Sequence, residues 1–221
     1  MFTFSAVPRV NYFQPAVFTE SAFRKFSIGK KFLCNHIKIQ LQKSVNELQK
    51  HFLNDFPNKK ILEVTSASED LIAKKLSAMN LQVMTSQGIY KVEQLFQAGK
   101  IFRNAGSQEK LLKLSSRKAK QENKVTNAHD ELVEFKIFNT KFPLEPKTYF
   151  YNWIYMKALH QHPNLVKEVV KYDAFTDIFF NSQKSINCQA QACSIYVSLL
   201  RRGILEETLA SKEKFLKNIY D

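Results

Sequence analysis

Three polar side chains close together in the sequence, Glu93, Gln97 and Lys100, have types and spacing that suit acid–base chemistry. If residues 88–102 form a helix, at 100° per residue Gln97 lies about +40° and Lys100 about −20° from Glu93, so the three share one face. Large apolar residues flank that face on both sides, whereas the polar face of a surface helix usually lies opposite its apolar stripe. The pattern favours the reactive wall of a pocket. A surface helix with mutually supporting polar neighbours is the alternative.

A second group of polar residues precedes a helix near the C-terminus. Segment 172–190 is polar and leads into a helix that we expect to begin near Asn187. Free backbone N–H groups at that start, close to Ser185, Asn187 and Gln189, suit a phosphate or ribose hydroxyls. Local capping by the same side chains is an equal alternative.

The elements that must position these residues are expected to be mainly α-helical. The 221 residues include only 5 Gly and 6 Pro, too few for a turn-rich barrel, and are 44% hydrophobic, enough for one sizeable core. The patterns predict helices over about 37–52, after an N-cap at Ser68, from Thr148 to about 159, from Pro163, and up to about Ile219, with short strands at 61–65 and 81–84.

Positive charge is concentrated in two stretches. Residues 1–60 carry ten Lys or Arg against three acids, and residues 100–124 carry eight against two, while the remainder has fifteen of each. Such concentration indicates a phosphate-bearing partner, with solvated lysine faces as the alternative. Basic residues interleaved with phenylalanines near the N-terminus suit single-stranded nucleic acid, although dense aromatics also suit a core. The candidate nucleic-acid-binding residues are Arg24, Lys25, Lys30, Lys31, Arg117 and Lys118.

Several classes of protein are disfavoured by composition. No apolar run approaches the roughly 20 residues that cross a bilayer, and the first residues lack a basic segment followed by an apolar one. We therefore expect a cytoplasmic protein without a membrane segment. The three cysteines are odd in number and lack zinc-ligand spacing, so neither disulfides nor a metal is predicted.

Several separated motifs resemble a known family. The segments LSAMNL (76–81), VEQLFQAGK (92–100) and LSSRKAK (114–120) look, in that order, like a NADAR domain. The segments PLEPKT (143–148), FYNWIY (150–155) and KSINCQA (184–190) resemble the branch that accompanies DarT-type toxins as an antitoxin. The resemblance covers about residue 61 to the end, and the N-terminal part more weakly.

The resemblance implies a mainly α fold, a NADAR-type helical domain with a few short strands. Residues 61–221 would form the catalytic domain, with a basic, aromatic module at 1–60 packed on it. Members of this branch are similar in being N-glycosidases that remove toxin-attached ADP-ribose from guanine in DNA. Other NADAR proteins hydrolyse a phosphoribosylamino-pyrimidine, and the domain needs no cofactor and no Gly-rich nucleotide loop.

Cleavage of a C1–N glycosidic bond needs an anion near the developing oxocarbenium ion and a proton donor for the leaving group or ring oxygen. Glu93 is the candidate carboxylate, and Gln97 would orient a ribose hydroxyl. Lys100 either donates the proton or, if its pKa is lowered, attacks C1 of a ring-opened sugar to form a Schiff base.

The resemblance adds further residues to the site. It implies a role for Asp177 and for the helix start at Asn187, although the segment 179–181 departs from the Trp-Gly of the wider domain. Trp153 and Tyr155 match aromatic positions of the family and would stack on adenine or guanine, with core packing as the alternative.

The expected partners are ADP-ribosylated, single-stranded DNA and a DarT-type toxin, and the sequence leaves the oligomeric state open. A non-catalytic antitoxin that binds nucleic acid or toxin is the first competing hypothesis. A glycosidase acting on a small phosphoribosylamino-pyrimidine is the second, but it leaves the basic N-terminal module unexplained.

Overall fold

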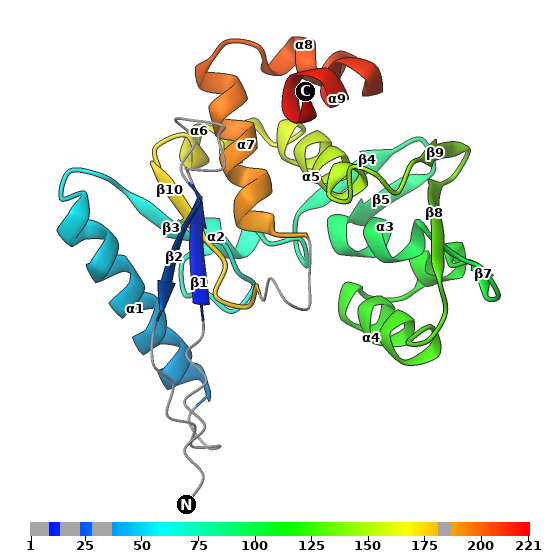
Figure 1. Ribbon diagram of the computed structural model, residues 1–221, viewed down its shortest axis with the longest axis horizontal. Coiled ribbons are helices and arrows are strands. Elements are labelled where there is room, and N and C mark those ends of the chain that lie inside the picture. The colour runs from blue at the N-terminus through cyan, green and yellow to red at the C-terminus, as the bar shows by residue number, and fades with distance from the viewer. Residues whose placement is uncertain (1–8, 14–22, 28–36, 181–186) are drawn as a thin grey trace, which may run out of the picture.

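The structure is a computed structural model that describes residues 9–13, 23–27, 37–180 and 187–221, with side chains from residue 42 onwards. This part of the chain is mainly helical and contains small sheets (Figure 1), as predicted. The helices are α1 (Ile37–Asp55), α2 (Leu71–Leu76), α3 (Val92–Ala98), the 3-10 helix η2 (Glu109–Lys113), α4 (Ser116–Thr126), α5 (Tyr149–His160), α6 (Pro163–Val169), α7 (Gln189–Arg201), α8 (Leu205–Ala210) and α9 (Lys212–Tyr220).

The strands form one composite sheet, one hairpin and one antiparallel sheet. The composite sheet has the order β2-β1-β10-β3, from β1 (Arg9–Phe13), β2 (Phe23–Ser27), β3 (Ile61–Glu63) and β10 (Ala174–Thr176). The hairpin joins β4 (Gln82–Thr85) to β5 (Gly88–Lys91). The antiparallel sheet has the order β7-β6-β8-β9, from β6 (Lys100–Phe102), β7 (Gly106–Ser107), β8 (Leu132–Ile137) and β9 (Thr140–Phe142).

The composite sheet joins segments that are far apart in the sequence. Strand β10 is antiparallel to β1 and parallel to β3, with Thr176 opposite Glu63. Helix α7 contacts β1 and β10 (Figure 1). Because parallel strands end at the same edge of a sheet, the residues that follow β3 and β10 emerge side by side. Strand β1 pairs with β10 of the 61–221 part and β2 pairs with β1, so these two strands of the predicted N-terminal module belong to this sheet.

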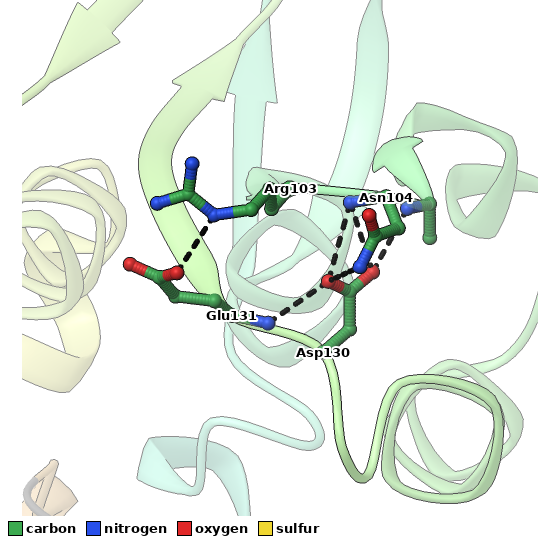
Figure 2. A network of polar contacts seen from close by, with 5 residues as sticks. Arg103, Asn104, Asp130 and Glu131 are labelled. Carbon is green, nitrogen blue, oxygen red and sulfur yellow. Dashed lines mark hydrogen bonds and ion pairs between the residues drawn. The ribbon is translucent and has the colours of Figure 1, made fainter.

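The antiparallel sheet carries Lys100 on its strand β6, opposite Phe135 of β8. The turn after β6 is tied to the start of β8 by the network of Figure 2. The Asp130 carboxylate accepts bonds from Asn104 N at 3.2 Å and Ala105 N at 2.8 Å, and Arg103 Nε donates to Glu131 Oε2 at 2.7 Å. These contacts fix the far end of the strand on which Lys100 lies.

The core is built around α5 and α7, whose buried side chains include Tyr155 and Tyr196. Gly99, directly after α3, allows close packing against α5, because a Cβ there would lie 2.6 Å from Phe150 Cζ. A larger residue at this position would require the Phe150 ring to move.

The prediction of a helix across residues 88–102 is wrong in its extent. Residues 88–91 form β5, which pairs with β4 after a turn at Gly88 (φ 137°). Helix α3 spans only Val92–Ala98, Gly99 ends it, and Lys100 begins a strand. A strand-forming Lys-Ile-Phe segment next to β8 outweighs the helical periodicity of so short a region.

Two local predictions also need correction. The N-cap of α2 is Asp70, whose Oδ1 accepts bonds from Ile72 N (2.6 Å) and Ala73 N (3.1 Å), and Ser68 instead accepts a bond from Asp70 N. Helix α7 begins at Gln189, two residues later than expected. Among the described helices, none is long and apolar enough to cross a membrane.

Candidate functional site

A cavity of about 1180 Å³ lies where two sides of the molecule face each other. One side comes from α3, α4 and β6, and the other from the segments that follow β3 and β10 and from the start of α7. Six of the residues predicted from the sequence line it, and they are Glu93, Gln97, Lys100, Asp177, Asn187 and Gln189.

Glu93, Gln97 and Lys100 form one hydrogen-bonded chain in the cavity wall. Gln97 Nε2 donates to Glu93 Oε1 at 2.8 Å, and Lys100 Nζ donates to Gln97 Oε1 at 2.8 Å. Glu93 is 5% exposed and Gln97 is 4% exposed. The Gln97 amide therefore links the Glu93 carboxyl group to the Lys100 amine. The role predicted for Gln97 was instead to orient a ribose hydroxyl.

Lysines surround the Glu93 carboxylate. Lys120 Nζ of α4 lies 3.6 Å from Glu93 Oε1 and is exposed. Burial lowers the pKa of Lys100 to about 8; Glu93 acts in the opposite direction, and Lys120 lowers the pKa further. A lysine with a pKa near 8 is neutral in about a tenth of molecules at pH 7, so it can act as a proton donor or as a nucleophile.

Two asparagines on or next to α4 extend this network, and sequence reasoning missed them. Asn123 Nδ2 donates to the Gln97 backbone oxygen at 2.8 Å and to Gln97 Oε1 at 3.0 Å. Asn127 Nδ2 donates to Asn123 Oδ1 at 2.9 Å. Lys120, Asn123 and Asn127 follow each other at three- and four-residue spacing, a pattern that marks one helix face and could have identified them.

Asp177 forms the opposite wall and follows β10 directly. Its Oδ1 accepts a bond from Phe179 N at 3.1 Å, and its side chain is 8% exposed. Burial raises the pKa of Asp177 to about 6, against hydrogen bonds from Phe179 N and the Gln189 side chain and the charge of Lys120. No described Lys, Arg or His forms an ion pair with it.

Tyr151 of α5 also lines the cavity and was missed as a site residue. Burial raises its hydroxyl pKa well above the usual value, and the charges of both Glu93 and Asp177 act in the same direction. The hydroxyl therefore keeps its proton and can donate a hydrogen bond, and the charges of both carboxyl groups act on it.

Trp153 and Tyr155 do not reach the cavity. Tyr155 is fully buried, and its hydroxyl donates to the Leu76 backbone oxygen at 2.6 Å. Trp153 lines a separate depression of about 500 Å³ and packs edge-on against Phe215. Since α5 is apolar around most of its circumference, these rings pack in the protein and lie away from any ligand in the cavity.

Gln189 has a structural task at the start of α7. Its Oε1 accepts a bond from Ala78 N at 2.9 Å, and its Nε2 donates to the Val64 oxygen at 2.6 Å. Asn187 lines the cavity two residues earlier. These bonds fix the start of α7 against the strand end that faces Asp177.

The predicted nucleic-acid-binding residues are only partly described. Arg117 and Lys118 are exposed on α4 outside the cavity lining, whereas Lys120, Lys124 and Lys147 line it. Arg24 and Lys25 lie on β2, for which only the backbone is described. Ser185, Lys30 and Lys31 lie outside the described residues.

Among residues 42–180 and 187–221, no group of three His, Cys, Asp or Glu side chains is arranged to hold a metal ion. The polar side chains that line this cavity carry carboxylic acids, amides, amines, aliphatic hydroxyls and a phenol. The donor set thus suits proton transfer and hydrogen bonding to a polar ligand.

Comparison with known proteins agrees with the motifs. A search of curated proteins gave no match to the chain. A family model for the DarT1-associated NADAR antitoxin matches residues 10–221, which includes both sides of the cavity and the strands β1 and β2. The chain therefore belongs to the family of DarT1-associated NADAR antitoxins.

Proposed function

We propose that this antitoxin is an N-glycosidase that removes ADP-ribose from guanine bases in DNA, and that it acts in the cytoplasm against a DarT-type ADP-ribosyltransferase. The observation that carries the proposal is one cavity with two buried carboxyl groups in different electrostatic surroundings. Glycoside cleavage commonly uses such a pair, one ionised and one protonated.

In this proposal the Glu93 carboxylate, held by Gln97 and paired with Lys120, stabilises the positive charge that develops at C1. Asp177 is the proton donor for the departing guanine amine. As the C1–N bond breaks, the electron pair stays on nitrogen and the Asp177 proton joins it. One water then adds to C1 and returns a proton to the Asp177 carboxylate, which gives free ADP-ribose and restored guanine.

A covalent route through Lys100 is the alternative within the same reaction. The neutral amine adds to C1 of the ring-opened sugar, its protons pass to the guanine nitrogen as the bond from C1 to guanine breaks, and water later hydrolyses the imine left on Lys100. If the imine forms, borohydride should attach the substrate to Lys100, and trapping should increase as pH rises from 7 towards 9, because the pKa of Lys100 is about 8. Mass spectrometry of the digested protein detects the adduct, and Lys100→Arg should abolish it. Absence of an adduct in an active sample favours direct acid–base hydrolysis.

The cavity has the size and charge for a nucleotide-like substrate. Its volume exceeds the roughly 300–1,000 Å³ of pockets for drug-sized ligands. Lys120, Lys124 and Lys147 supply positive charge for a pyrophosphate and for nearby DNA phosphates. Phe179, 57% exposed at the same cavity, is an aromatic ring that can stack on a base, which was the task predicted for Trp153 and Tyr155.

The direct test is to incubate the protein with guanine-ADP-ribosylated single-stranded DNA and to measure released ADP-ribose by chromatography and mass spectrometry. We expect release with recovery of unmodified guanine. Absence of release with stoichiometric, correctly folded protein would overturn the proposal. A phosphoribosylamino-pyrimidine as competing substrate distinguishes the small-molecule glycosidase.

A binding-only antitoxin is the second candidate, because Arg117 and Lys118 are exposed beyond the cavity and need no catalysis to contact DNA. In that case unmodified single strands should bind tightly, with log affinity falling by roughly 0.7 per phosphate contact for each tenfold rise in salt. Protection of cells by a protein with both Glu93 and Lys100 replaced would favour this candidate.

A further inference from the structure

Glu63, at the end of β3, holds the chain on both sides of Asp177. Thr176 Oγ1 donates to Glu63 Oε2 at 2.5 Å, and Ile178 N donates to Glu63 Oε1 at 2.7 Å. Both carboxyl oxygens are thus used on the two residues that flank Asp177. Glu63 is 3% exposed and lies behind the cavity wall, outside its lining.

Making these two contacts with a buried carboxyl group carries a desolvation cost. Burying a carboxylate without a cation costs several kcal/mol, and no Lys, Arg or His in the described ranges pairs with Glu63. A glutamine of the same shape could accept from Ile178 N and donate to the Thr176 hydroxyl. Hydrogen bonding alone therefore does not explain an acid at this position.

Coupling to Asp177 explains why residue 63 carries a carboxyl group. Burial, and then the charge of Asp177, raise the pKa of Glu63 to about 7, so the two carboxyl groups compete for protons. The other charged or titratable groups that act on this pair come from α4, α5 and the start and body of α7, and they are Lys120, Tyr151, Tyr155, Cys188 and Cys193. Lys120 is the single cation among them, and it also pairs with Glu93.

We propose that Glu63 is a positioning residue for Asp177: it fixes the strand end that presents Asp177 to the cavity, and its acidity keeps a proton available there. This inference rests on the proposed glycosidase function for its catalytic meaning. The geometry on which it stands belongs to the free protein and can be tested without substrate.

The decisive variant is Glu63→Gln, which keeps size and hydrogen-bonding capacity but removes the acid. We expect it to fold with unchanged or higher thermal stability, because a buried acid is replaced by a neutral amide. Carboxyl carbon-13 NMR should show the Asp177 signal titrating over both steps of the coupled pair, near pH 6 and pH 7, in the wild type, and over the lower step alone in Glu63→Gln. In the glycosidase assay, kcat/KM at neutral pH should fall about tenfold with little change in KM, and the pH limit of activity should move to lower pH.

The matched control is Thr176→Val, which removes the hydroxyl bonded to Glu63 and leaves the acid in place. If the acid matters, the Asp177 titration in this variant should stay near that of the wild type. A change in Thr176→Val equal to that in Glu63→Gln would show that the hydrogen bond, and not the acid, is what counts, and would overturn the proposal.

The two possible failures are distinguishable. If the wild-type protein releases no ADP-ribose, the proposed function fails, while the NMR titration still decides the role of Glu63. If the wild type is active and Glu63→Gln keeps its rate, its pH profile and the Asp177 titration, only the inference about Glu63 fails.

Discussion

The two walls of the cavity use the same kind of group in opposite ways. Glu93 lies among Lys100, Lys120 and the Gln97 amide, so positive charge and donors surround its carboxylate. Asp177 has a second buried carboxyl group, Glu63, behind it, and among the described charged groups Lys120 is the one that lowers its pKa. The surroundings of Glu93 thus supply positive charge to its carboxylate, whereas burial raises the pKa of Asp177 to about 6.

The walls also differ in how the chain builds them. The Glu93 wall is local, since α3 and the following strand supply the acid, the amide and the amine within eight residues. The Asp177 wall needs the parallel pairing of β3 with β10, which brings together residues more than one hundred positions apart. Surroundings, and not residue type, thus decide which acid holds the proton.

The difference between the two walls can be tested first at Glu93. Glu93→Gln removes the negative charge that we assign to stabilising the oxocarbenium ion, and it should lower kcat by roughly 10²- to 10⁴-fold. Release of ADP-ribose at saturating substrate measures the effect. Glu134→Gln is the matched control, because Glu134 pairs with Lys141 away from the cavity lining and should leave kcat unchanged. A rate unchanged in Glu93→Gln would return this residue to a structural role.

The second way is to remove the proton donor. Asp177→Asn should lower kcat/KM by roughly 10²- to 10³-fold, since general acid catalysis contributes on that order. In the wild type, activity that needs protonated Asp177 should decrease as pH rises above about 6, because the acid is then ionised. The pH profile of kcat/KM measures this, and the decrease should be absent from the residual activity of Asp177→Asn. A profile that instead rises through pH 6 would mean that Asp177 acts as a base.

The smallest effect is expected at Phe179, whose exposed ring lies at the cavity. Phe179→Ala should weaken binding of modified single-stranded DNA by about 1–3 kcal/mol if the ring stacks on a base. Fluorescence anisotropy with a labelled oligonucleotide measures the affinity. Trp153→Phe, on the far side of α5, should leave affinity unchanged because Trp153 packs against Phe215. Equal losses in both variants would contradict this assignment.

Much of the local structure could be predicted from sequence patterns. The helix that follows Pro163 and the stop at Gly203 (φ 71°) after α7 lie where residue preferences place them. The hydrogen bond between Glu93 and Gln97 likewise follows from four-residue spacing on a real helix.

Lys100 shows the limit of such patterns. It joins the same network as predicted, although it lies on β6 and not on the helix. The turn at Gly99 keeps its amine next to Gln97, and helical periodicity does not predict that turn. Tyr155 shows the opposite error, since a motif position suggested a ligand contact and the ring is fully buried.

The sequence by itself determined the pairing of Glu93 with Gln97 and the order of the family motifs, because neighbours along a helix are set by spacing alone. Only the tertiary structure placed Glu63 behind Asp177 and Tyr151 within reach of both acids, because these contacts depend on strand register and packing between distant segments. The proton affinities of the acids follow from the same packing, since burial and neighbouring charges set a pKa and neither can be read from spacing.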